Sequence, residues 1–274
     1  MNLARTTTFL SNQRSRLFRF TPPPSTIFTC KPTQIPARAR LSSSATMADQ
    51  PTPNRRLQNP ALFVCDLQEK FRNAIWQFDK IVLTSRKVLR AAQVLKIPVY
   101  VTTQNGAKLG AVVPEIQELV GDAAVTADKT RFSMMIPEIE PHFPHVLPPP
   151  SATTATTAAA AAGGTQEQQQ QPREVVIVGI ESHICVTQTA LDLRARGHRV
   201  YVLADAVSSC NPQEVPLALA RLRAEGVVVT TSESWLYECM GDARVPEFRD
   251  VARVVKDTGH DTRAALAGLL GSKI

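Results

Sequence analysis

The chain has 274 residues, of which 43% are apolar, which is enough for one large core or two small ones. No run of eighteen or more apolar residues is present, and this argues against a transmembrane helix. The formal net charge of +7 at pH 7 would suit a nucleic-acid partner if it were spread over the whole chain. However, residues 1–46 contain seven basic residues and no acidic one, which leaves 24 basic and 24 acidic residues for the rest. We therefore expect neither nucleic acid nor a membrane as a partner.

Residues 1–46 are rich in Arg, Ser and Thr and free of acids, a composition typical of an organelle transit peptide. Arg40-Leu41 followed by Ser42-Ser43-Ser44 looks like a mitochondrial processing site, so we predict a mitochondrial protein. Import into a chloroplast is the alternative, because the segment is also rich in Pro. If translation starts at Met47, the segment is absent and the protein is cytoplasmic.

The composition changes at several points along the chain. We predict a leader over 1–46, a linker over 47–60, one α/β domain over 61–257 and a tail over 258–274. Residues 147–172, LPPPSATTATTAAAAAGGTQEQQQQP, are low-complexity sequence, which we interpret as a loop insertion in that domain. The five cysteines are odd in number and form no C-x-x-C pair, so neither a disulfide framework nor a zinc site is expected.

Short apolar runs alternate with helical patterns through the domain. Because the runs are continuous rather than alternating, they predict strands that are covered on both faces, as in a doubly wound parallel sheet with helices on each side. Ser182 and Ser232 are predicted as helix N-caps, Gly241 as a helix stop, and Asn211 as the start of a capping box. The expected strands are 61–65, 98–102, 123–126, 174–178, 199–204 and 226–230.

Three polar residues follow strands at the edge where ligands of parallel sheets bind. Asp66 follows the first strand, Lys129 the third, and Cys185 the fourth, close to the start of a helix whose amide groups favour a thiolate. Each also has a plain structural interpretation: Asp66 as a turn or cap residue, Lys129 as a solvated loop lysine, and Cys185 as a small buried apolar residue.

Three segments together resemble the isochorismatase-like cysteine hydrolases. They are CDLQEKF (65–71), DKTRFSM (128–134) and GIESHICVTQTALDL (179–193), and the similarity extends over residues 58–256 outside the insertion. The subgroup resembled is that of the isochorismatase domain-containing proteins. The resemblance implies a six-stranded parallel sheet in the order 3-2-1-4-5-6. It also implies Asp66, Lys129 and Cys185 as catalytic residues, with a cis peptide bond between Ile180 and Glu181 in an oxyanion-binding turn.

The resemblance also implies a mechanism through a covalent thioester-type intermediate. Asp66 would take the proton of Cys185, whose thiolate would attack a small metabolite at an amide or imide C–N bond, and backbone amides would hold the oxyanion. Nicotinamidases of the family carry an Asp-x-His metal motif, but residues 102–106 supply no such ligands, so we expect neither a metal nor a cofactor. Candidate pocket residues are Gln68, Phe71, Gln104, Phe132 and His183.

Two other functions compete with a hydrolase, of which one stays open and one is disfavoured. A non-catalytic binding or scaffold protein could keep the same fold without turnover. A nucleotide-binding Rossmann domain is disfavoured, because no G-x-G-x-x-G follows the first strand. Since members of the resembled family commonly assemble, a homo-oligomer is possible; the sequence indicates neither the substrate nor the oligomeric state.

Overall fold

The computed structural model describes residues 55–146 and 171–271. The predicted leader, most of the linker and nearly all of the low-complexity insertion lie outside these residues, so what we predicted for them stays a prediction. None of the helices in the described ranges combines the length and apolar character that crossing a bilayer requires.

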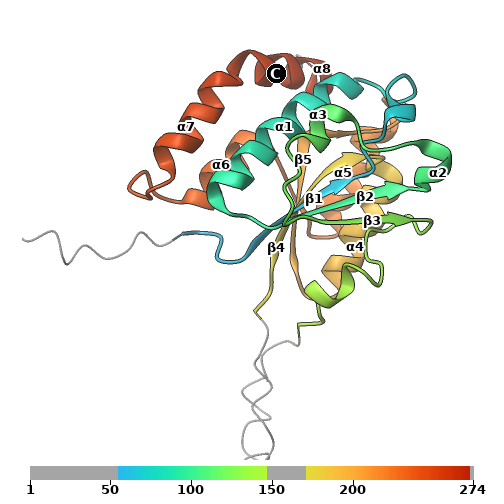
Figure 1. The fold of residues 1–274 in the computed structure, drawn as a ribbon, viewed down its shortest axis with the longest axis horizontal. Helices are drawn as coiled ribbons and strands as arrows, with labels where there is room; N and C mark the ends of the chain where they lie inside the picture. The colour runs from blue at the N-terminus through green and yellow to red at the C-terminus, as the bar shows by residue number, and fades with distance from the viewer. Residues whose placement is uncertain (1–54, 147–170, 272–274) are drawn as a thin grey trace, which may run out of the picture. The chain divides into compact units, whose positions relative to one another are not determined.

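The core of the domain is a six-stranded parallel sheet in the order β3-β2-β1-β4-β5-β6, which confirms the predicted fold (Figure 1). The strand predicted at 123–126 begins and ends later, so that Asp128 and Lys129 belong to the strand itself rather than to the loop after it. The strands are β1 (Pro60–Cys65), β2 (Val99–Gln104), β3 (Val125–Lys129), β4 (Glu174–Ile180), β5 (Arg199–Ser208) and β6 (Val228–Thr230).

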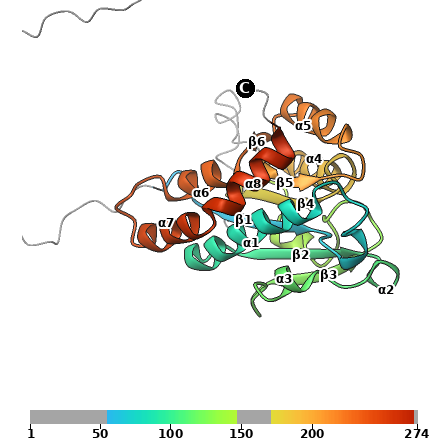
Figure 2. The same cartoon turned by 90° about the horizontal axis from the view of Figure 1, so that it is seen from above.

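Helices cover both faces of the sheet and give three layers (Figures 1 and 2). Successive strand residues point to opposite faces, so that Phe63 belongs to one apolar core and its neighbour Val64 to the other. The Val64 core includes α1 (Phe78–Leu95), α3 (Pro114–Gln117), α6 (Ser232–Met240), α7 (Phe248–Asp257) and α8 (Gly259–Leu270). The Phe63 core includes α4 (Thr187–Ala195), α5 (Glu214–Ala224) and residues 134–143.

The prediction of a tail over 258–274 is wrong for most of its length. Residues Gly259–Leu270 form helix α8, which packs against α1 and β5. Ala265 and Leu269 are four residues apart and bury one face of the helix, and Lys87 of α1 donates a hydrogen bond to Thr262 Oγ1 at 2.8 Å. The small residues of this segment gave a weak apolar pattern, although small residues are sufficient for close helix packing.

The predicted helix caps need correction. Ser182 does not cap: its hydroxyl is buried without a hydrogen-bond partner, and the residue opens a π-helical turn. Thr231 caps α6 by accepting from Ser234 N, while Ser232 is the first helical residue and donates its hydroxyl to Asp205. The residue before α5 makes no side-chain cap hydrogen bond, so the capping box from Asn211 does not form. Gly241 ends α6 as predicted.

Gly179 packs tightly against the end of β1. It lies beside Cys65 in the sheet and has a φ of +114°. A Cβ atom there would lie 2.0 Å from the carbonyl oxygen of Cys65, so only glycine fits. The close approach brings the end of β4, and the turn that follows it, against the end of β1.

Candidate active site

Asp66 directly follows β1 and is turned into the protein interior. Its φ of +52° takes the chain out of the extended conformation at the end of the strand. Its carboxylate accepts a hydrogen bond from Thr102 Oγ1 at 2.8 Å and another from Lys129 Nζ at 2.8 Å. The side chains of Lys129 and Asp66 are 0% and 2% exposed, so the two charges form a buried ion pair.

Lys129 is the last residue of β3 and is fixed by three acceptors. Besides Asp66, its ammonium donates to Gln104 Oε1 at 2.6 Å and to the carbonyl oxygen of Phe132 at 3.0 Å. Burial alone would lower the pKa of Lys129, but the negative charges that Cys65, Asp66 and Cys185 can carry outweigh it and raise the pKa above its usual value. The amine therefore stays protonated and supplies a fixed positive charge at this edge of the sheet.

Cys185 lies in the turn that connects β4 to α4. The peptide bond between Ile180 and Glu181 is cis, as the resemblance implies, and Ser182–Val186 then form a π-helical turn. The amides of Ile184 and Val186 both donate to the carbonyl oxygen of Glu181 at 3.1 Å. The sulfur of Cys185 lies within 4.8 Å of a carboxylate oxygen of Asp66. The structure thus brings together Asp66, Lys129 and Cys185, which lie far apart in sequence.

A cavity of about 140 Å³ opens over these groups. It includes five of the predicted pocket and turn residues, together with Ile184, which the sequence analysis did not single out. Phe132 is 50% exposed at this site. The volume corresponds to about five water molecules at their share of liquid volume. The lining residues are Asp66, Phe71, Gln104, Phe132, Ile180, Glu181, Ile184 and Cys185.

Gln68 and His183, both expected in the pocket, do not line this cavity. Gln68 is fully buried and links two segments: its side chain accepts from Gln104 N at 2.7 Å and donates to the carbonyl oxygen of Gly110 at 2.7 Å. His183 forms a hydrogen bond through Nδ1 with Ser209 Oγ at 2.9 Å. Both positions therefore support the walls around the site.

Cys65 also belongs to the site, although it is the last residue of the buried strand β1. Its sulfur is 3.5 Å from Asp66 Oδ2, and it lies within 4.8 Å of the Cys185 sulfur. Burial, followed by the hydrogen bond to Cys185 and the charge of Asp66, raises the pKa of Cys65 well above its usual value, so that it stays a thiol. Strand alternation would point Cys65 and Asp66 to opposite faces, but the positive φ at Asp66 breaks that alternation.

The ligand atoms of Cys65, Asp66 and Cys185 are close enough together to bind a soft metal ion. However, Lys129 already donates to Asp66 at 2.8 Å. A metal ion would have to displace this ammonium or approach it closely, at a large electrostatic cost. The donor set therefore fits a protonated, metal-free site better than a metal centre.

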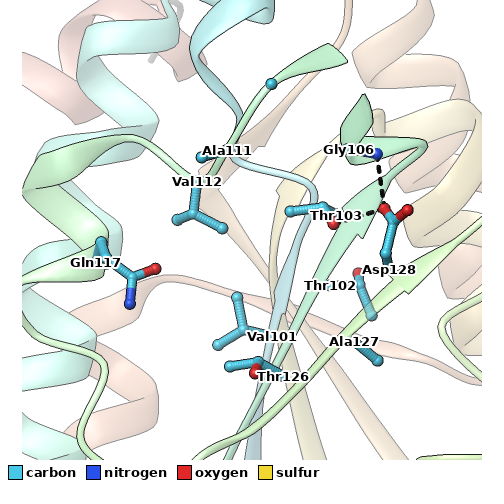
Figure 3. A pocket seen from close by; sticks show the side chains of 11 residues that line it. Val101, Thr102, Thr103, Gly106, Ala111, Val112, Gln117, Thr126, Ala127 and Asp128 are labelled. Carbon is cyan, nitrogen blue, oxygen red and sulfur yellow. Dashed lines mark hydrogen bonds between the residues drawn. The ribbon is translucent and has the colours of Figure 1, made fainter. Parts of the chain in front are cut away.

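A larger cavity of about 520 Å³ lies between β2, β3 and the segment that contains α2 (Gly106–Leu109) and α3 (Figure 3). Asp128 at its rim accepts from Thr103 Oγ1 and from Gly106 N, both at 2.7 Å. The hydrogen bond from Thr103, with that from Gly106, lowers the pKa of Asp128. Because none of the side chains that line this cavity is a thiol, an amine or an imidazole, the smaller cavity at Cys185 is the candidate active site.

Comparison with known proteins identifies the family of the chain. Residues 60–234 match the family model for the isochorismatase domain. The chain belongs to the isochorismatase domain family. Within it, isochorismatase domain-containing protein 2 from Xenopus laevis is 36% identical over 205 residues, which are 75% of this chain and 87% of that protein.

Two solved structures have the same fold. The MAR1 ribonuclease from Caenorhabditis elegans is 36% identical with a TM-score of 0.61, and the match covers 75% of this chain and 91% of that one. The YcaC gene product from Escherichia coli, described as an octameric hydrolase of unknown specificity, is 20% identical with a TM-score of 0.58, over 76% of this chain and 92% of that one. The chain therefore shares the fold of these proteins.

Proposed function

We propose that the protein is a cysteine hydrolase that cleaves a C–N bond in a small amide or imide. The observation that carries the proposal is the sulfur of Cys185 within 4.8 Å of the Asp66 carboxylate, beside a cavity of about 140 Å³. A nucleophile and a base at one cavity, with a fixed cation bonded to the base, are groups that suit covalent hydrolysis.

The reaction begins with proton transfer from the Cys185 thiol to Asp66. The thiolate attacks the carbonyl carbon of the substrate, and the oxygen gains negative charge. The amides of Ile184 and Val186 already donate to Glu181, so we assign the oxyanion to the amide of Cys185 between them. Asp66 then protonates the leaving nitrogen, and a thioester remains on Cys185.

Hydrolysis of the thioester reverses these roles. Asp66, again a carboxylate, takes a proton from water, the resulting hydroxide attacks the thioester, and the Cys185 thiolate leaves. Lys129 holds Asp66 in place through the 2.8 Å ion pair, and its positive charge offsets the negative charge of the thiolate when the thiolate forms. Lys129 is thus a positioning and electrostatic residue rather than a proton donor.

The substrate is small and only partly polar. The cavity is well below the usual 300 Å³ or more of drug-sized ligand sites, which favours a metabolite with few heavy atoms. Phe71, Phe132 and Ile184 supply apolar walls, while Gln104 and the backbone supply polar contacts.

RNA is a less favourable substrate, although one relative is named as a ribonuclease. The chain after residue 46 has equal numbers of acidic and basic residues, and the small cavity does not accommodate a nucleotide. A non-catalytic scaffold is the remaining alternative. It would have no use for a thiol and an acid that line one cavity, with an amine paired to the acid.

The test is trapping of the covalent intermediate. The full chain is mixed with a panel of small amides and imides, and with an RNA oligonucleotide, then quenched in acid and analysed by intact mass. We expect an acyl adduct on Cys185 and turnover of at least one amide or imide, both lost in Cys185→Ala. Turnover that persists in Cys185→Ala would overturn the proposal, and so would cleavage of the RNA without turnover of any amide or imide. The absence of both turnover and adduct with the whole panel would favour a scaffold.

A further inference from the structure

The site holds a second thiol that the proposed hydrolysis does not use. Cys65 is 0% exposed and Cys185 is 7% exposed, and their sulfur atoms lie within 4.8 Å of each other. A disulfide needs a sulfur separation of about 2 Å, so a combined movement of under about 3 Å joins them. The two cysteines come from β1 and from the turn after β4, strands that are direct neighbours in the sheet.

We propose that Cys65 is the resolving thiol of a reversible oxidation of Cys185 by hydrogen peroxide or a small organic hydroperoxide. This inference shares one assumption with the proposed function, namely that Cys185 reacts as a thiolate. In the first step Asp66 takes the thiol proton of Cys185, and the thiolate attacks the terminal oxygen of the peroxide. The O–O bond breaks, and the departing hydroxide, or the alkoxide of an organic hydroperoxide, takes this proton back from Asp66 and leaves as water or as an alcohol. Cys185 is now a sulfenic acid, oxidised by two electrons, and the peroxide is reduced.

In the second step the sulfur of Cys65 attacks the sulfur of Cys185. The S–O bond breaks, a disulfide forms, and the departing hydroxide gains a proton to become water. The proton of Cys65 passes to Asp66, whose Oδ2 is 3.5 Å from the Cys65 sulfur. Overall, two thiols and one hydrogen peroxide give one disulfide and two water molecules.

The two cysteines differ in a way that fixes their order. Cys65 has no direct access to solvent, and burial raises its pKa, so it does not react with peroxide first. Cys185 lines the cavity, and the cavity easily accommodates a molecule with two oxygen atoms. Cys65 therefore acts second, on a sulfur that has already been oxidised beside it. The disulfide removes the nucleophile from the site and protects it from irreversible oxidation.

The test follows the oxidation state of Cys185 in the full-length protein by peptide mapping. Wild-type protein and the variants Cys65→Ser, Cys65→Ala and Cys239→Ser are treated with hydrogen peroxide. Half of each sample is then reduced with dithiothreitol, and all free thiols are alkylated. Cys239 is the matched control, because it is also buried in the same domain but does not belong to this site.

We expect a Cys65–Cys185 linked peptide in wild type and in Cys239→Ser, with full recovery of alkylatable Cys185 after reduction. In both Cys65 variants, Cys185 should proceed to the sulfinic acid, with at least about tenfold less recovery. Equal recovery in wild type and the Cys65 variants, a disulfide from Cys185 to another cysteine, or no oxidation of Cys185 would overturn the inference. An acyl adduct without this disulfide would leave the proposed function intact, and the disulfide without any adduct would leave this inference intact.

Discussion

Replacing Lys129 with methionine tests the buried ion pair at the centre of the site. Methionine has a similar length but no charge, so the change leaves the Asp66 carboxylate buried without its cation. At a separation of 2.8 Å and an effective dielectric constant near 20, the direct attraction between the two charges is about 6 kcal/mol. The net loss is smaller, because the ammonium is no longer desolvated. We expect Lys129→Met to lower the free energy of unfolding by about 3–5 kcal/mol.

Urea denaturation at pH 7 and low salt measures this loss, and Lys108→Met on the exposed helix α2 is the matched control. The control should change the free energy of unfolding by at most about 0.5 kcal/mol. The double variant Asp66→Asn/Lys129→Met should recover at least half of the loss, because it also removes the charge that was left unpaired.

A loss below about 1 kcal/mol in Lys129→Met would refute this reasoning, because that is the value of a solvent-exposed pair. Failure of Asp66→Asn to recover any stability in the double variant would also count against it. In that case the contribution of Lys129 would come from its hydrogen bonds to Gln104 and Phe132 rather than from the charge of Asp66.

Two further predictions concern the framework around the site. Gly179→Ala should lower the free energy of unfolding by more than about 3 kcal/mol, because it combines a strained φ with a clash against Cys65. The control is Gly121→Ala, where a Cβ meets no atom within 4 Å, and it should be nearly neutral in the same denaturation assay. Equal losses of stability in the two variants would contradict this account. Burial lowers the pKa of Lys87 in the folded protein, so the unfolded chain binds the Lys87 proton more tightly. The free energy of unfolding therefore rises as the pH increases from the folded-state pKa of Lys87 toward about 10.4, the pKa of a free lysine. Lys87→Met should reduce the slope of unfolding free energy against pH by up to about 1.4 kcal/mol per pH unit, compared with the exposed control Lys256→Met. Parallel curves for the two variants would contradict this prediction.

The sheet could be predicted because its strands are short, apolar and separated by helical patterns. Such strands must be covered on both faces, and the carboxyl ends of parallel strands meet at one edge. That rule placed Asp66, Lys129 and Cys185 at one edge as candidates, and the resemblance then assigned them together as catalytic residues. The order of the strands came from the resemblance, because local patterns carry no information on which strands pair.

The departures from the prediction arise where local rules are overridden by tertiary contacts. Cys65 lies within a buried apolar strand, a pattern that predicts a core residue, but the positive φ at Asp66 brings the two neighbouring side chains to one site. Ser182 was assigned as a cap from its residue type, but the turn there is π-helical and leaves the hydroxyl without a partner. Helix α8 was missed because its buried residues are few and include a small alanine.

The most direct test of the account compares alkylation of Cys185 and Cys210 in one sample of wild-type protein. Cys210 is exposed, but a hydrogen bond to Glu181 raises its pKa, whereas Cys185 is buried, lines the cavity and lies within range of the positive charge of Lys129. Iodoacetamide at pH 7, followed by peptide mapping over time, gives both rates. The account predicts that the buried Cys185 is alkylated at least about tenfold faster than Cys210, and that Lys129→Met removes most of this difference. Faster alkylation of Cys210 than of Cys185 would contradict a reactive thiolate at this site.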